Sequence, residues 1–430
     1  MAARLTQSDP DFESRFVALL SAKREASEDV DATVRSIIAE VRARGDAALI
    51  DFIAQFDGVT IHPERLRFTE RELAGADSTV PQEVRAALAL ARDRIEAYHR
   101  RQVPEDANKT DPLGVELCWR WSAVESVGLY VPGGTAAYPS SVLMNAIPAK
   151  VAGVERVVMT VPAPEGKLNP TVLVAAKLAG VHEIYCVGGA QAIAALAYGT
   201  ETIRPVVKIV GPGNAYVAAA KRQVFGTVGI DMIAGPSEVL VIADARANPN
   251  WVAADLLAQA EHDPSAQAIL ITDSEPLADA VEDAVEGQLQ SLPRRVTAGA
   301  SWRDFGAIIV VASLQDGVAL ANRLAPEHIE LIVAAPERLL PGIRNAGAIF
   351  VGGYTPEAIG DYIAGSNHVL PTARSARFSS GLSVLDFMKR TSILKCGPEQ
   401  LHKLGPAAMT LAEAEGLEAH RRSVAIRLNI

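Results

Sequence analysis

Short apolar runs rich in β-branched residues alternate with alanine-rich amphipathic stretches through most of the chain. Three such runs, 157–161, 183–187 and 206–210, each precede a helical stretch, at 171–180, 190–199 and 215–225. Further runs lie at 238–242, 268–272, 307–311, 329–333 and 348–351. Strands that are apolar on both faces and alternate with helices are typical of parallel sheets covered on both sides. The pattern therefore predicts an α/β protein with two such units.

The segments outside this alternation have a different character. Residues 11–105 are mostly helical in pattern, with amphipathic periodicity from Val30 to Ala54 and a charged helix from Glu83 to Arg100. Residues 119–131 are expected to be extended and to lead into a turn at Pro132-Gly-Gly134. The tail from about residue 382 is rich in helix formers, which predicts a separate helical appendage.

Composition limits the classes of partner. The 430 residues include 41 basic and 51 acidic side chains, for a net charge of −10, which disfavours nucleic acid and anionic membranes as partners. The N-terminal residues contain no apolar signal-peptide core, and no apolar run approaches the roughly 18 residues of a membrane span, so we expect a cytoplasmic protein. The cysteines, Cys118, Cys186 and Cys396, are too widely spaced for a thiolate metal site or a disulfide framework.

Gln259 and His262 are candidate metal ligands. They lie three positions apart on a predicted helix that begins after Asn248-Pro249 and ends at Asp263-Pro264, so they are expected to share one face. An amide oxygen and an imidazole nitrogen, joined by a carboxylate and another imidazole, would suit zinc. The same pattern also fits a solvated helix end, and the spacing alone leaves both readings open.

Two further motifs carry possible chemistry. Glu327-His328 places a carboxylate and an imidazole at a loop-to-strand junction, where both can reach one cleft and where histidine could act as a base. A solvent-facing pair is the alternative. Gly211-Pro-Gly213 follows a strand and opens a helix, which suits phosphate binding, but Tyr216 replaces the third glycine of the dinucleotide fingerprint. Asp231, twenty residues on, precedes an unusual loop instead of ending a clear strand.

Several long and unusual sequence words occur in order. They are Gly211-Pro-Gly-Asn-Ala-Tyr-Val217, Ile230-Asp-Met-Ile-Ala-Gly-Pro-Ser-Glu238, Gln259-Ala-Glu-His262, Ala325-Pro-Glu-His-Ile-Glu330, Gly360-Asp361 with Gly365-Ser-Asn-His368, and Glu415-Gly416 with His420-Arg421. Together they resemble the histidinol dehydrogenases, zinc enzymes that end histidine biosynthesis. The resemblance extends from about residue 30 to the end of the chain.

The resemblance implies a fold of two incomplete Rossmann-like domains, one inserted in the other, with small helical ends. The expected divisions are an N-terminal helical arm at 1–24, a discontinuous α/β domain at 25–129 plus 237–381, an inserted NAD-contacting domain at 130–236, and a C-terminal helical tail at 382–430 that reaches the partner subunit.

The resemblance also implies the cofactors and the site residues. Two NAD molecules and one zinc ion per subunit would serve the four-electron oxidation of L-histidinol to L-histidine through L-histidinal. By resemblance His328 takes the hydroxyl proton and Glu327 activates water, while NAD contacts Tyr130, Gln191 and Asn214. The implied zinc ligands are Gln259, His262, Asp361 and His420, and the implied substrate contacts are Ser237, Gln259, His262, His328, Asp361, Glu415 and His420.

Glu415 and His420 come from the neighbouring subunit in the family, which implies a homodimer with shared active sites. Three alternatives stay open. One is a relative that oxidises another small polar alcohol, such as a sulfonated diol. The others are a zinc hydrolase in which Glu327 activates a metal-bound water, and a non-catalytic protein that binds a metal or an amino acid.

Overall fold

The computed structural model describes residues 2–21, 28–133, 138–164, 168–233 and 235–430. These residues form two compact units. The first consists of Met1–Gln102 with Glu125–Phe387, and the second of Val103–Val124 with Met388–Ile430. Among the described helices, none is both long enough and apolar enough to cross a bilayer.

The first unit contains a five-stranded parallel sheet with the order β6-β5-β4-β7-β8. Its strands are β4 (Ser126–Tyr130), β5 (Arg156–Val161), β6 (Glu183–Cys186), β7 (Lys208–Val210) and β8 (Gly229–Ile230). The chain moves outward from β4 to β6 and then returns to add β7 and β8 on the other side of β4. The gap between the carboxyl ends of β4 and β7 is therefore a topological switch point, where open α/β sheets usually bind ligands.

Helices cover both faces of this sheet. The helices of the alternating region are α6 (Pro139–Val151), α7 (Pro170–Leu178), α8 (Gly189–Tyr198) and α9 (Ala215–Val224). The N-terminal region adds α2 (Glu28–Arg44), α3 (Asp46–Asp57), α4 (Glu70–Ala76) and α5 (Gln82–Arg100). Apolar side chains of α2 and α3 share one core with α8 and α9, while α5 packs on α6 and α7. The domain boundaries above stay a prediction, but this packing argues for attaching residues 28–100 to the first sheet.

A six-stranded parallel sheet forms the rest of the first unit, with the order β1-β11-β10-β9-β12-β13. Its strands are β1 (Ala3–Thr6), β9 (Glu238–Ala243), β10 (Gln267–Thr272), β11 (Ala307–Val310), β12 (His328–Ile332) and β13 (Ala348–Val351). The helices that accompany it are α1 (Phe12–Ser21), α10 (Pro249–Ala260), α11 (Glu275–Leu289), α12 (Arg295–Phe305), α13 (Leu314–Leu324) and α14 (Glu357–Tyr362). Short 3₁₀ turns lie at Pro63–Arg65, Pro336–Arg338, Leu340–Gly342, Ser375–Arg377 and Val384–Phe387.

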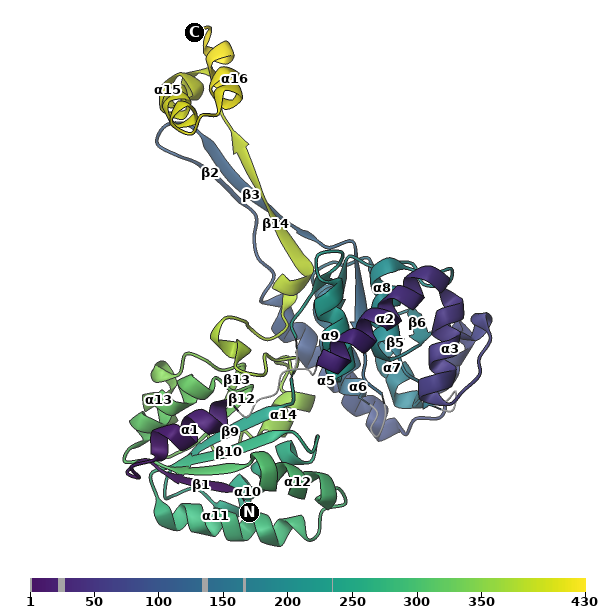
Figure 1. The fold of residues 1–430 in the computed structure, drawn as a ribbon, viewed down its shortest axis with the longest axis vertical. Helices are drawn as coiled ribbons and strands as arrows, with labels where there is room; N and C mark the ends of the chain where they lie inside the picture. The colour runs from purple at the N-terminus through teal and green to yellow at the C-terminus, as the bar shows by residue number, and fades with distance from the viewer. Residues whose placement is uncertain (1, 22–27, 134–137, 165–167, 234) are drawn as a thin grey trace. The chain divides into compact units, whose positions relative to one another are not determined.

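Alternate residues of the central strands face opposite cores. Val239 and Val241 pack with α10, α11 and α12, whereas Leu240 and Ile242 pack with α1 and α13. Figure 1 shows these helices on the two faces of the sheet. Both faces are thus buried, which explains why the strands are continuously apolar in the sequence. The predicted α/β class with two parallel sheets is confirmed.

The second unit is a three-stranded antiparallel sheet followed by two helices (Figure 1). The strands are β2 (Ala107–Thr110), β3 (Glu116–Ala123) and β14 (Met388–Lys395), and the helices are α15 (Pro398–Ala414) and α16 (Glu418–Leu428). Large apolar side chains of this unit are exposed, among them Leu394 at 67%, Leu411 at 64% and Ile426 at 62%.

Three expectations about local structure need correction. The extended run at 119–131 is divided between β3 and β4, which belong to different units. The tail contains a strand, β14, before its two helices, because its alternating residues pair with β3. The N-terminal arm begins with β1, which pairs with β11, and only then forms a helix. Gly134 of the expected turn lies outside the described residues, as do positions 1 and 22–24 of the arm.

Candidate active site

His328 is the first residue of β12 and is buried between Val239 of β9 and Ala348 of β13 in the register of the sheet. Its Nδ1 lies 3.0 Å from the carbonyl oxygen of Glu238, an acceptor that requires a proton on Nδ1. Its Nε2 has no hydrogen-bond partner among the described residues. This arrangement fixes the neutral tautomer that leaves Nε2 able to accept a proton.

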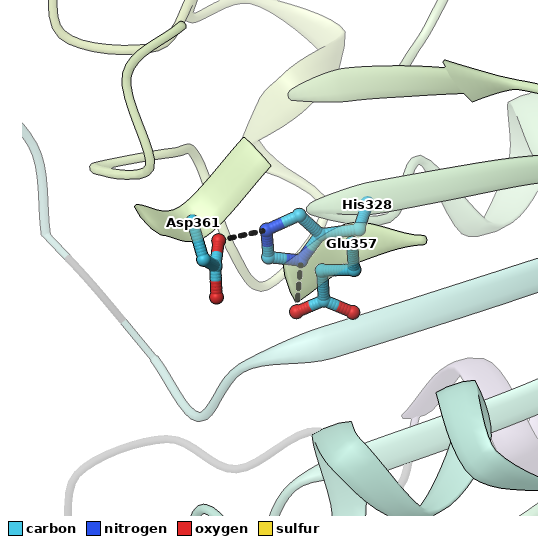
Figure 2. A group of neighbouring side chains, drawn as sticks. All are labelled: His328, Glu357 and Asp361. Carbon is cyan, nitrogen blue, oxygen red and sulfur yellow. Dashed lines mark ion pairs between the residues drawn. The ribbon is translucent and has the colours of Figure 1, made fainter. Parts of the chain in front are cut away.

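Three carboxyl groups surround this imidazole. Glu357 Oε1 lies 3.4 Å and Glu327 Oε2 lies 3.8 Å from Nδ1, while Asp361 Oδ1 lies 3.8 Å from Nε2. Figure 2 shows Asp361 and Glu357 next to different nitrogen atoms of the ring. His328, Glu357 and Asp361 each offer a ligand atom within 4.8 Å of the others. These three donor atoms are enough to make the group a candidate metal site.

Burial controls the charge of this cluster. It lowers the pKa of His328 to about 3, so the ring is neutral at neutral pH, and it raises the pKa of Asp361 to about 7. The pKa of Glu357 also lies well above its usual value, first because of burial and then because Asp361 and Glu327 are near. Desolvation is the largest cause of the lowered pKa of His328, and the nearby imidazoles of His262 and His368 lower it further. A divalent cation here would favour the ionised carboxylates.

Glu327 precedes the strand and is buried with it. Its Oε2 accepts a hydrogen bond of 3.0 Å from the backbone N–H of Glu238, which fixes the carboxyl group beside β9. Glu327 and Ser237 both line a pocket in the first unit, together with His368 and residues of the turn at Gly211 and Pro212. The pocket lies at the amino ends of β9 and β12 in the six-stranded sheet and at the carboxyl end of β7 in the five-stranded sheet.

The structure modifies the expectation for Gln259 and His262. The helix begins as predicted, with Asn248 Oδ1 accepting a hydrogen bond of 2.9 Å from the backbone N–H of Asn250. It ends at Ala260, however, and His262 lies in a turn whose N–H donates to the carbonyl of Gln259 at 3.2 Å. The predicted helix is therefore two residues too long, whereas the shared side of Gln259 and His262 stays a prediction.

These two residues differ in their surroundings. Gln259 is fully buried, and neither Oε1 nor Nε2 has a hydrogen-bond partner among the described residues. An unpaired buried amide is costly, which fits a side chain that serves a ligand. His262 is exposed, yet enough protein surrounds its ring for desolvation to lower its pKa. It lies close enough to His328 and His368 to influence the pKa of both.

Two neighbours of the site had no role in the sequence interpretation. His368 Nδ1 lies 3.0 Å from the backbone oxygen of Asp361, and its Nε2 lies 3.3 Å from Ser141 Oγ. Glu357 lies in α14 four positions before Asp361, so both carboxyls occupy one side of a short helix. Two acidic residues at positions i and i+4 after Pro356 indicate that Glu357 and Asp361 lie on one side of a helix. This spacing is the only hint that the sequence offers about Glu357.

The three predicted NAD contacts lie near the switch point of the five-stranded sheet. Tyr130 ends β4, and its hydroxyl accepts a hydrogen bond of 3.1 Å from the backbone N–H of Gly189, two residues before the buried Gln191. Asn214 follows β7 and caps α9, with Oδ1 accepting from the N–H groups of Tyr216 and Val217, both at 3.1 Å. Asn214 is thus the N-cap of α9, and its side-chain oxygen serves in that role.

Glu415 and His420 belong to the second unit. Glu415 follows the last residue of α15, His420 lies in the first turn of α16, and both are exposed. The first unit by itself brings together Ser237, Glu327, His328 and Asp361 but not these two residues.

Two parallel sheets with a switch point, joined to a buried acid–base cluster, define a Rossmann-like α/β enzyme. The family profile of histidinol dehydrogenase matches residues 20–428. The chain is 67% identical to the histidinol dehydrogenase of Brucella suis biovar 1 (strain 1330) and 68% identical to that of Mesorhizobium japonicum (strain LMG 29417 / CECT 9101 / MAFF 303099), over 430 residues that cover all of each protein. The crystal structure of histidinol dehydrogenase from Elizabethkingia anophelis superposes with a TM-score of 0.95 at 37% identity, covering 100% of this chain and 98% of that one.

This chain belongs to the histidinol dehydrogenase family. The resemblance inferred from the sequence words is confirmed, and the chain is an NAD-dependent oxidoreductase.

Proposed function

We propose that the chain oxidises L-histidinol to L-histidine through L-histidinal, the last step of histidine biosynthesis, at the cluster around His328. The observation that carries the mechanism is the imidazole of His328, held through Nδ1, with Nε2 unbonded beside Asp361 and with Glu327 near Nδ1. Bound NAD supplies the hydride acceptor in each of the two oxidation steps.

His328 serves as the first base. As the carbinol carbon loses its hydride, Nε2 takes the hydroxyl proton and the C–O bond becomes the carbonyl of the aldehyde. Because burial keeps the ring neutral, the lone pair of Nε2 is available at neutral pH. The carbonyl of Glu238 keeps Nδ1 protonated and stabilises the imidazolium that forms.

Glu327 serves the second half of the reaction. Water must add to the aldehyde before a second hydride can leave, and Glu327 takes one proton from that water. The backbone N–H of Glu238 holds one oxygen of this carboxyl in place. The hydrate, which has lost this proton and carries one alkoxide oxygen, then loses a hydride from carbon, which gives the carboxylic acid.

The donors of the first unit fit a zinc site formed by Gln259, His262 and Asp361, with His420 from the neighbouring subunit. The support is the buried amide of Gln259, which lacks partners, and the desolvated carboxyl of Asp361. Zinc, when bound, would hold the imidazole and amino nitrogens of the substrate. Ser237 and the neighbouring subunit's Glu415 would contact the same molecule, and Tyr130, Gln191 and Asn214 would contact NAD.

A homodimer with shared sites follows from the same proposal. The apolar side chains exposed on the second unit, such as Leu394, Leu411 and Ile426, support it because a partner would cover them. Glu415 and His420 lie in this unit and are exposed, so they are free to serve a site on another chain.

The test is the number of NADH molecules formed per molecule of limiting L-histidinol. We expect two, with activity lost to a chelator and restored by zinc. One NADH would mean that oxidation stops at the aldehyde and that the role of Glu327 is wrong. No NADH from folded, zinc-loaded protein would overturn the substrate assignment.

A further inference from the structure

Lys221 of α9 and Asp231, which follows β8, form an ion pair in the interior of the first unit. Their side chains are 2% and 0% exposed. Both also bind Gly211: Lys221 Nζ donates to the carbonyl oxygen of Gly211 at 2.9 Å, and Asp231 Oδ2 accepts from its N–H at 2.8 Å. One buried pair of charges thus holds both polar backbone groups of a single glycine.

At Gly211 the turn after β7 packs closely against the backbone of β4. Its φ of +117° lies in the region that favours glycine. A Cβ on this residue would lie 2.1 Å from the backbone oxygen of Tyr130, so no other residue fits without moving one of the strands. The glycine therefore lies directly at the switch point, between Tyr130 and the turn that leads to Asn214.

Stability alone is a poor reason for such a pair. Removing two charges from water costs several kcal/mol per ion, and an apolar pair of similar volume often stabilises a fold as well or better. Asp231 lies twenty residues after Gly211, the spacing of the acidic residue that binds ribose in dinucleotide folds. Its side chain is fully buried and bound to Lys221, so it instead holds the backbone of the turn.

We propose that Lys221 and Asp231 are positioning residues for the nicotinamide cofactor. By binding both backbone groups of Gly211, they fix the position of the turn and of the first residues of α9. They thereby fix the position of Asn214 relative to Tyr130. Gly211, Pro212, Lys221 and Asp231 all line one pocket of the first unit. This inference rests on the proposed NAD site and adds to it two residues that never touch the cofactor.

The test uses the full-length, zinc-loaded protein with both charges removed, as Lys221→Met with Asp231→Asn. The asparagine at position 231 can still accept a hydrogen bond from the N–H of Gly211. The carbonyl oxygen of Gly211, in contrast, loses the hydrogen bond that Lys221 donates. We expect the KM for NAD and the Kd for NADH, measured by fluorescence, to rise about tenfold. The zinc content should change less than about twofold, since none of the proposed zinc ligands lies in this turn.

The matched control is the ion pair between Arg156 and Glu183, with Nη2 to Oε2 at 2.9 Å and side chains 17% and 19% exposed. It joins the first residues of β5 and β6, at the opposite end of the same sheet. Arg156→Met should lower the melting temperature and leave the Kd for NADH unchanged.

A folded double variant whose KM for NAD and Kd for NADH stay within about twofold of wild type would overturn the inference. So would an equal weakening of NADH binding in Arg156→Met, because the effect would then be general instability. If the double variant does not fold, Asp231→Asn alone is measured by the same NADH titration and must weaken binding. A wild-type protein that binds NADH but does not oxidise histidinol would contradict the proposed substrate and leave the binding comparison intact.

Discussion

Glu330 gives a quantitative test of the buried acidic cluster. The residue lies in β12, is 1% exposed, and has its pKa raised to about 9, mainly by burial and then by Asp255 beside it. At pH 7 it is therefore protonated, and Glu330→Gln replaces a neutral acid with a neutral amide of the same shape. The new amide oxygen can still accept the hydrogen bond of 2.6 Å that Oε1 receives from the N–H of Glu357.

The expected effect is a change in pH dependence. The folded protein keeps this proton up to pH about 9, whereas the unfolded chain releases it near the ordinary value of 4.5. Between these limits the folded state holds one proton more, so the free energy of unfolding of wild type falls by about 1.4 kcal/mol for each pH unit. The variant lacks this contribution. The free energy of unfolding of the variant, relative to that of wild type, should therefore rise by about 3 kcal/mol between pH 6 and pH 8.

The assay is urea unfolding of both proteins at pH 6, 7 and 8, with a chelator present so that no cation changes the charge of the cluster. Glu286→Gln in α11 is the control, because Glu286 is exposed and its variant should follow the wild-type curve. A difference between Glu330→Gln and wild type that stays constant over this pH range, or moves in the other direction, would refute the argument that Glu330 is buried as the neutral acid.

Two further predictions concern the site, and a third concerns the buried thiol of Cys186. His328→Asn should keep zinc but lower kcat by about 10² or more, because the base at Nε2 is lost; unchanged turnover would exclude the assignment. His420→Asn should lose zinc, and mixing it with Gln259→Ala should restore activity if the two residues serve one site from different chains; no recovery after verified subunit exchange would argue for single-chain sites. Burial raises the pKa of Cys186 to about 11, so iodoacetamide at pH 8 should modify the exposed Cys396 and spare Cys186, as read by peptide mass spectrometry; rapid labelling of Cys186 would contradict its burial.

The strands of both parallel sheets were predictable because burial on both faces leaves a continuous apolar run. The run at 348–351 coincides with β13, and that at 238–242 falls one residue short of the end of β9. The same rule could not find β14, because most of its residues are exposed. No residue of β3 is buried either, and this strand was predicted only from Trp119 onward. The pairing of β3 with β14 joins segments that are far apart in the sequence. Nor could the rule separate β3 from β4, because a change of unit between two extended segments leaves no mark on hydrophobicity.

The candidate site was partly accessible from sequence for a similar reason. Glu327 and His328 occur in a recognisable word, and the structure brings them to Asp361 and Ser237. Glu357 and Glu330 were missed because nothing in the sequence distinguishes a buried acid from a solvated one. Lys221 had the appearance of an ordinary helix-surface lysine, and only the packing of α9 over the turn at Gly211 reveals its partner.

The strand β1 has a consequence for synthesis of the chain. Ala3–Thr6 pairs with Ala307–Val310, so β1 must wait for a partner strand that is synthesised much later. The five-stranded sheet, complete once Ile230 has emerged, can fold well before β11 exists. During this interval β1 and α1 expose an unpaired edge and two phenylalanines, Phe12 and Phe16, that are later buried. A nascent chain arrested before residue 307 should therefore hold a folded five-stranded sheet and an N-terminal segment that is open to chaperones.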